Sequence, residues 1–138
     1  MTGARSGPPL DPPAILVVDD EPSIRRLIGA ALRAEGYRVL LAADGPQALD
    51  LAARGNPDLV LLDVALPLLS GHEVLRRLRL SPATARTPVL LLSGLASPLE
   101  AGPARSLGAQ GVIAKPFSPA ELLRRVAEAL PRPLLAPG

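Results

Sequence analysis

The stretch AILVVDDE (residues 14–21) joins five apolar residues directly to three acids. Four further apolar runs occur along the chain, namely YRVLLA (37–42), DLVLL (58–62), PVLLL (88–92) and GVIA (111–114). Four of the five runs are apolar at consecutive positions, as parallel strands that are buried on both faces usually are. The runs are therefore predicted to be the strands of one parallel sheet.

Helical patterns separate these runs. Residues 23–35 and 118–130 each place their apolar side chains on one stripe. Helix starts with capping-box spacing occur at Asp44 with Gln47, Ser70 with Glu73, Ser97 with Glu100 and Ser118 with Glu121. Strands that alternate with helices predict an α/β protein, a (βα)5 flavodoxin-like fold with strand order 2-1-3-4-5 and helices on both faces.

The ends of the chain differ from its middle. Residues 1–13 carry Gly and Pro without periodicity, so we expect a disordered N-terminal tail. Residues 14–130 form the single predicted domain. Residues 131–138 read as a short C-terminal tail, because the prolines of PRPLLAPG do not continue a helix. We expect no helix-turn-helix after Pro131, because too few residues follow it.

The composition argues against several classes of protein. The sequence has no cysteine, which excludes disulfides, thiolate metal sites and thiol nucleophiles. No apolar run approaches the roughly 18 residues of a membrane span, and the start lacks a secretory signal, so we expect a cytoplasmic protein with no membrane partner. The net charge is +2, but the arginines are scattered, and the only aromatic residues, Tyr37 and Phe117, do not provide a stacking platform. We therefore expect no direct contact with nucleic acid.

Polar residues follow four of the five predicted strands. Asp19 and Asp20 come after the first strand, Asp63 after the third, Ser93 after the fourth and Lys115 after the fifth. Ligands of such sheets bind beyond the carboxyl ends of the strands, so these side chains are expected to gather there. Each one alone has an ordinary explanation as a cap, a turn or a surface residue. Together, oxygen ligands without His or Cys favour Mg²⁺ as a cofactor.

Four blocks of the sequence resemble a known family. VVDDEP (17–22), LLDVALPLLSG (61–71), LLSG (91–94) and VIAKPF (112–117) are similar, in order and spacing, to the signature blocks of the receiver domain of two-component response regulators. The resemblance covers about residues 14–130. It implies that Asp63 is the phosphoacceptor and that a sensor histidine kinase or a phosphotransfer protein is the donor.

The resemblance also implies a role for the residues around Asp63. The Mg²⁺ ligands would be Asp20, Asp63 and the backbone carbonyl of Ala65, with Asp19 acting through a water. Ser93 would hydrogen-bond the phosphoryl group, Lys115 would reach Asp63 and then the phosphoryl group, and the Lys115–Pro116 bond would be cis. Lys115 is the only lysine in the chain. Its compact ammonium group fits beside a metal ion better than the planar fork of an arginine.

Three features depart from the family pattern. Ala65 and Leu95 occupy positions where the family often has polar side chains, and neither can orient a hydrolytic water, so we expect a long-lived phosphoryl group. Val112 replaces the aromatic residue that usually moves together with Ser93 as the output switch. Gly102 and Pro103 fall inside the predicted fourth helix, residues 97–107, which should therefore be short or kinked.

These observations predict a single-domain response regulator that is not an enzyme. It would signal by docking to a downstream target protein or by relaying the phosphoryl group, and it could form a homodimer through the fourth helix, fifth strand and fifth helix. Two alternatives stay open: a degenerate receiver that binds proteins without phosphorylation, and an aspartyl-phosphate phosphatase of the haloacid-dehalogenase kind. A flavin or nucleotide carrier fits less well, because the sequence lacks a glycine-rich phosphate loop.

Overall fold

The computed structural model describes residues 11–94, 105–131 and 133–134. Five parallel strands form one sheet in the order β2-β1-β3-β4-β5. The strands are β1 (Ala14–Val18), β2 (Arg38–Ala42), β3 (Leu59–Asp63), β4 (Val89–Ser93) and β5 (Gly111–Ala114). The predicted fold and strand order are confirmed, and each strand lies within one residue of the predicted run at either end.

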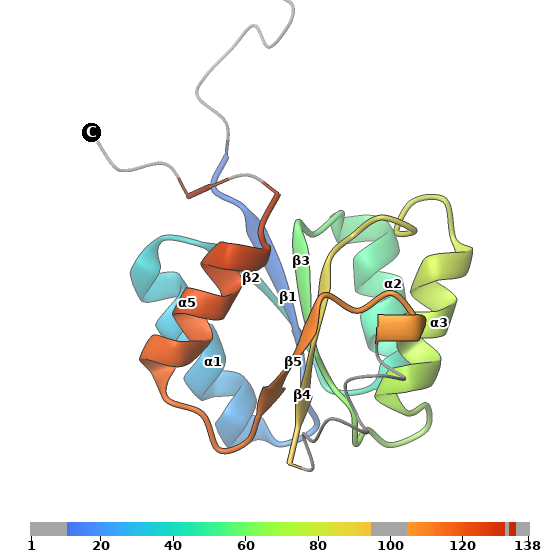
Figure 1. Cartoon of the computed structure of the whole chain (residues 1–138), viewed down its shortest axis with the longest axis horizontal. Helices are drawn as coiled ribbons and strands as arrows, with labels where there is room; N and C mark the ends of the chain where they lie inside the picture. Colours follow the sequence, from blue (N-terminus) through green and yellow to red (C-terminus); the bar gives the residue numbers. More distant parts are fainter. Residues whose placement is uncertain (1–10, 95–104, 132, 135–138) are drawn as a thin grey trace, which may run out of the picture.

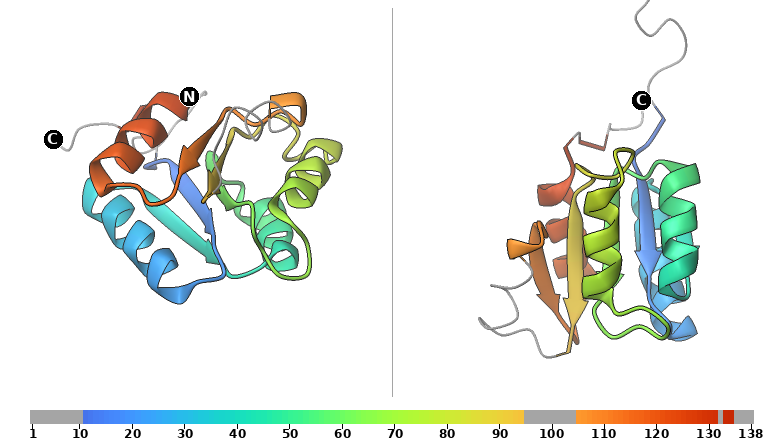
Figure 2. Two further views of the ribbon diagram at one scale, coloured as in Figure 1. Left: turned by 60° about the horizontal axis from the view of Figure 1, so that its bottom comes forward. Right: turned by 90° about the vertical axis from the view of Figure 1, so that its right-hand side faces the viewer.

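Helices cover both faces of the sheet. They are α1 (Pro22–Glu35), α2 (Gly45–Gly55), α3 (Gly71–Leu80) and α5 (Pro119–Ala129). Helices α1 and α5 lie on one face and α2 and α3 on the other, which gives three layers (Figures 1 and 2). Most of the predicted fourth helix, residues 97–107, lies outside the described residues, and so do Gly102 and Pro103.

The sheet separates two hydrophobic cores, because successive side chains of a strand point to opposite faces. Leu16, Val60 and Leu62 pack with Val74 and Leu75 of α3. On the other face, the alternate strand residues pack with helices α1 and α5; they include Ile15, Val17, Leu59, Leu61 and Ile113. The three inner strands are buried at every position. The residues that follow the carboxyl ends of these strands are therefore attached to a rigid, buried part of the sheet.

Three of the predicted helix starts are confirmed. The side chains of Asp44, Ser70 and Ser118 each accept a hydrogen bond from the backbone N–H three residues later. The reciprocal contacts differ from a capping box. Gln47 accepts from the N–H of Ala43, and Glu73 pairs with two arginines instead. The predicted start at Ser97 lies outside the described residues.

Parts of both predicted tails contact the domain. The backbone carbonyls of Pro12 and Pro13 accept hydrogen bonds from Arg38. Leu134 packs beside Gly36, which ends α1 with a φ of 108°. Within the described residues, no helix has the length and the apolar character that crossing a membrane requires.

Candidate functional site

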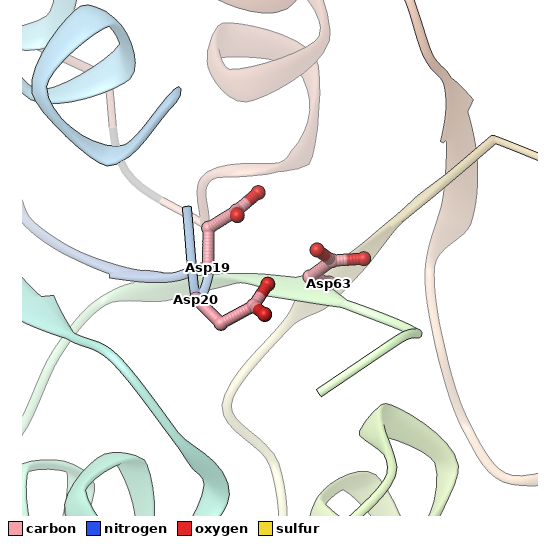
Figure 3. Close-up of side chains that lie close together, drawn as sticks. All are labelled: Asp19, Asp20 and Asp63. Atoms are coloured by element: carbon pink, nitrogen blue, oxygen red, sulfur yellow. The ribbon is translucent and has the colours of Figure 1, made fainter. Parts of the chain in front are cut away.

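Three carboxylates meet where β1 and β3 end. The two strands are neighbours, with Val18 in register with Leu62, so Asp19 and Asp63 follow the paired residues directly. Carboxylate oxygens of Asp19, Asp20 and Asp63 lie within 4.8 Å of one another. Figure 3 shows Asp20 pointing from the end of β1 toward Asp63. The prediction that these acids lie together is confirmed.

Asp19 is the most constrained residue of the three. Its side chain is fully buried; Oδ1 accepts from the N–H of Glu21 at 2.9 Å and Oδ2 accepts from Lys115 Nζ at 3.0 Å. Its backbone N–H donates to Ala42, and its carbonyl accepts from Arg25 Nη1 at 2.7 Å. The Asp19 side chain is thus already engaged, whereas Asp20 is exposed and turned toward the shared space.

Lys115 joins two strand ends through one ammonium group. Its Nζ donates to Asp63 Oδ2 at 2.9 Å as well as to Asp19. The expected contact with Asp63 is confirmed, and the Lys115–Pro116 bond is cis. The equal contact with Asp19 was not predicted. In the structure Lys115 therefore neutralises two buried carboxylates.

The environment shifts the proton affinities of this pair. Burial raises the pKa of Asp63 above its usual value, although the hydrogen bonds from Lys115 and the Ala65 N–H oppose the change. Burial acts to lower the pKa of Lys115, but the hydrogen bonds to Asp63 and Asp19 outweigh it and the pKa is raised. Lys115 is therefore cationic at neutral pH.

The remaining predicted site residues lie around Asp63. Ser93 ends β4 and is buried, and its carbonyl accepts from the Lys115 N–H. Ala65 is exposed, and its N–H donates to Asp63 Oδ1 at 3.1 Å. Val112 is half-buried in β5 against the core on the α2–α3 side, in the position where the family has an aromatic residue. Leu95 lies outside the described residues.

The loop after Asp63 is closed tightly upon itself. The N–H of Gly71 donates to the carbonyl of Val64 at 2.8 Å, and a Cβ at residue 71 would meet the Asp63 carbonyl oxygen. At the tip of the loop, Leu68 has a φ of 71° and is 79% exposed, while Leu69 N–H donates to the Pro67 carbonyl. This pattern is a γ-turn with a positive central φ, which is rare and strained.

An apolar hollow of about 320 Å³ opens beside the lysine. It is lined by Ile24, Leu27, Lys115, Pro116 and Phe117. Leu27 is 48% exposed and borders this hollow, because α1 packs on the sheet through Ile28 and Leu32.

The donor set fits a hard divalent cation. The acids grouped there, Asp19, Asp20 and Asp63, offer carboxylate oxygens as ligands, and the chain has no cysteine. Mg²⁺ prefers such oxygen ligands and commonly uses one or two carboxylates together with water. Lys115 pairs with Oδ2 of both Asp19 and Asp63, so Asp20 and the other oxygen of Asp63 are the carboxylate oxygens that could hold a metal.

Sequence reasoning missed two contacts of this site. The hydrogen bond from Arg25 to the Asp19 carbonyl connects α1 to the strand end. It joins residues six positions apart across a strand–helix junction, a spacing for which no local motif exists. The Lys115–Asp19 ion pair spans 96 positions and joins the ends of β5 and β1, which are not neighbours in the sheet. The predicted strand order alone therefore does not indicate the second contact.

Comparison with protein families gives one match over most of the chain. The pattern of the response regulator receiver domain matches residues 15–127. Among solved structures, the chemotaxis protein CheY4 of Vibrio cholerae superimposes with a TM-score of 0.82 at 35% identity, covering 86% of this chain and 98% of that one. The receiver domain of the sensor histidine kinase PA1611 from Pseudomonas aeruginosa, solved with magnesium in its active-site cleft, has a TM-score of 0.77 at 37% identity. That match covers 86% of this chain and 97% of the other.

Curated relatives are longer proteins. The chain is 46% identical over 116 residues to the uncharacterized transcriptional regulatory protein YkoG of Bacillus subtilis, which is 84% of this chain and 50% of that protein. It is 39% identical to the DNA-binding response regulator MtrA of Mycolicibacterium smegmatis, again covering 50% of that protein and 86% of this chain. The chain thus spans about half the length of these curated relatives.

Proposed function

The chain belongs to the response regulator receiver family, and from this premise we propose that it is a phosphoacceptor switch. Asp63 accepts a phosphoryl group from a phosphohistidine of a sensor kinase or phosphotransfer protein, and Mg²⁺ is required. The observation that carries this proposal is the placement of the Lys115 ammonium 2.9 Å from Asp63, in a group of acids to which the exposed Asp20 also belongs.

The residues present account for the chemistry of such a transfer. A carboxylate oxygen of Asp63 forms a bond to phosphorus while the phosphorus–nitrogen bond of the donor breaks, and the departing imidazole keeps the electron pair and takes a proton. Phosphoryl transfer depends mainly on positioning and on neutralising charge. A Mg²⁺ ion held by Asp20, Asp63 and the Ala65 carbonyl would supply part of that positive charge.

Lys115 supplies the rest of the positive charge that the transfer needs. Lys115 neutralises the oxygens of the incoming group by moving from Asp63 Oδ2 while it keeps its contact with Asp19. Ser93, buried at the end of the adjacent strand, donates a hydrogen bond to a phosphoryl oxygen. Asp19 contributes through a water in addition to anchoring the lysine.

This activity is stoichiometric rather than enzymatic. The phosphorylated chain signals in the cytoplasm by docking to a target protein or by passing the phosphoryl group on, without contacting nucleic acid or membrane itself. The hollow beside Lys115 gives a donor protein an apolar contact next to the acceptor. A homodimer through the face that includes β5 and α5 belongs to the same proposal, since β5 is an edge strand.

The alternatives have less support. A haloacid-dehalogenase-like phosphatase needs its nucleophile after the first strand, where Asp19 is fully buried and paired with Lys115. A phosphate-independent binding module has no need of an ammonium group that bridges two acids, but Val112 remains consistent with it.

Intact-mass spectrometry after incubation with acetyl phosphate and Mg²⁺ tests the proposal. The wild type should gain about 80 Da, the mass of one phosphoryl group, and Asp63→Asn should not. An EDTA-treated sample should also stay unmodified. A wild type that gains no mass would favour the phosphate-independent module.

A further inference from the structure

Arg25 reaches from α1 back to the end of β1. Its Nη1 donates to the carbonyl oxygen of Asp19 at 2.7 Å, a shorter distance than either ion pair of Lys115. Arg25 is half-buried, whereas the next residue, Arg26, is exposed. Two adjacent arginines of one helix thus have different surroundings, and only the first contacts the residue that precedes Asp20.

The junction between β1 and α1 lacks the side-chain cap that other helices have, so the hydrogen bond from Arg25 to Asp19 matters there. Helices α2, α3 and α5 begin with a side-chain cap, but Glu21, which precedes α1, makes no side-chain cap hydrogen bond. The Glu21 N–H donates instead to Asp19 Oδ1. The start of α1 is therefore held by Asp19, and Asp19 is in turn held by Arg25.

Asp20 depends on this arrangement. Among the residues that the structure describes, its carboxylate has no hydrogen bond or ion pair, so its direction follows from the backbone on either side. Without the guanidinium, the carbonyl of the buried Asp19 would lose its donor, and leaving a buried polar group unpaired costs enough free energy to favour local rearrangement. The Asp19–Asp20 peptide would then be free to turn.

We propose that Arg25 is a positioning residue for the metal site: by fixing the Asp19–Asp20 peptide it aims the Asp20 carboxylate at Asp63. The inference rests on the proposed function, because it concerns the divalent cation which that function requires. Arg25 touches neither the metal nor the phosphoryl group in this account. It acts through the backbone of Asp19.

The direction in which Mg²⁺ affinity changes when Arg25 is removed distinguishes a positioning role from a purely electrostatic one. Arg25 carries a positive charge near an acidic site, so electrostatics alone predicts that its removal tightens the binding of a divalent cation. Loss of positioning predicts the opposite. We expect Arg25→Ala to weaken Mg²⁺ binding about three- to tenfold. Loss of a hydrogen bond to a metal-binding residue commonly lowers metal affinity by about 10- to 100-fold, and Arg25 acts less directly, through the backbone.

Isothermal titration calorimetry with MgCl2 measures this on the full chain. The variants are Arg25→Ala, Arg25→Lys, which keeps the charge and a shorter donor, and Arg26→Ala, which removes the neighbouring exposed charge. We expect weaker binding for Arg25→Ala, an intermediate value for Arg25→Lys and unchanged or slightly tighter binding for Arg26→Ala. Arg25→Ala binding that is as tight as wild type, or tighter, overturns the proposal.

Hydrogen exchange of the metal-free protein gives a second readout. The Glu21 amide should lose protection in Arg25→Ala and keep it in Arg26→Ala, because the bond to Asp19 Oδ1 depends on the fixed peptide. Unchanged protection in Arg25→Ala counts against the proposal. If the wild type bound no Mg²⁺, the proposed function would fail, and the exchange experiment would still decide whether Arg25 holds the junction.

Discussion

Replacing Lys115 with Met removes one ammonium group and keeps most of the aliphatic stem. Two carboxylates then lose their partner, those of Asp19 and Asp63, whose side chains are 0% and 6% exposed. Breaking a buried ion pair by removing one partner commonly destabilises a protein by about 3–5 kcal/mol. We expect a smaller loss, about 2–4 kcal/mol, because both acids keep a backbone N–H bond and Lys115 itself is 21% exposed.

The measurement is urea unfolding followed by far-UV circular dichroism in EDTA, since the chain has no tryptophan. Arg124→Met is the matched control: it removes an exposed cation paired with Glu128 at 3.2 Å, and the expected loss is below about 0.5 kcal/mol. Adding Asp19→Asn to Lys115→Met should recover part of the loss, because one uncompensated charge disappears.

The loss should also depend on pH. The pKa of Asp63 is already raised by burial, and removal of Lys115 raises it further. A carboxyl group whose folded-state pKa exceeds its unfolded value stabilises the folded state while protonated, and this stability is lost as the pH rises through the folded-state pKa. The deficit of Lys115→Met should therefore be smaller at pH 4.5 than at pH 7.5. A deficit below about 1 kcal/mol, or one equal at both pH values, would refute the reasoning.

Three further predictions concern the loop after the acceptor. Gly71→Ala should lower the free energy of unfolding by about 3 kcal/mol or more, since its Cβ would lie 2.7 Å from the backbone Cα of Val64; a loss under 1 kcal/mol in urea unfolding would contradict this. Leu68→Asn should raise stability by roughly 1 kcal/mol, because Asn tolerates a positive φ better than Leu; an unchanged or lower melting temperature would count against a strained turn. The phosphoryl group on Asp63 should persist on the order of hours, because Ala65 cannot orient a water; decay within seconds, followed by intact mass, would exclude this, and Ala65→Asn should shorten the lifetime.

Much of the fold follows from local patterns in the sequence. Strands that are buried on both faces appear in the sequence as continuous apolar runs, and β1, β3 and β4 are buried at every position. Helix starts are local as well, because a cap such as Asp44 acts on an N–H only three residues away. Both signals involve neighbouring residues and need no knowledge of tertiary structure.

The site was predictable in part. Polar residues at strand ends, together with the strand order, bring Asp19, Asp20, Asp63 and Lys115 to one place. The pairing within that group was not predictable from spacing, because Lys115 can reach two carboxylates and the sequence does not say which. The positive φ of Leu68 carried no signal either, since PLLS contains no Gly, Asn or Asp, the residues that usually adopt a positive φ.

The central claim is that Asp63 receives the phosphoryl group, and chemical mapping tests it most directly. Borohydride reduces an aspartyl phosphate to homoserine, so the acetyl-phosphate-treated protein, reduced and digested, reports the modified residue by peptide mass spectrometry. The account predicts homoserine at position 63 in samples that contain Mg²⁺ and unmodified peptide in samples with EDTA. Homoserine at position 19 or 20, or none at any position, would contradict it.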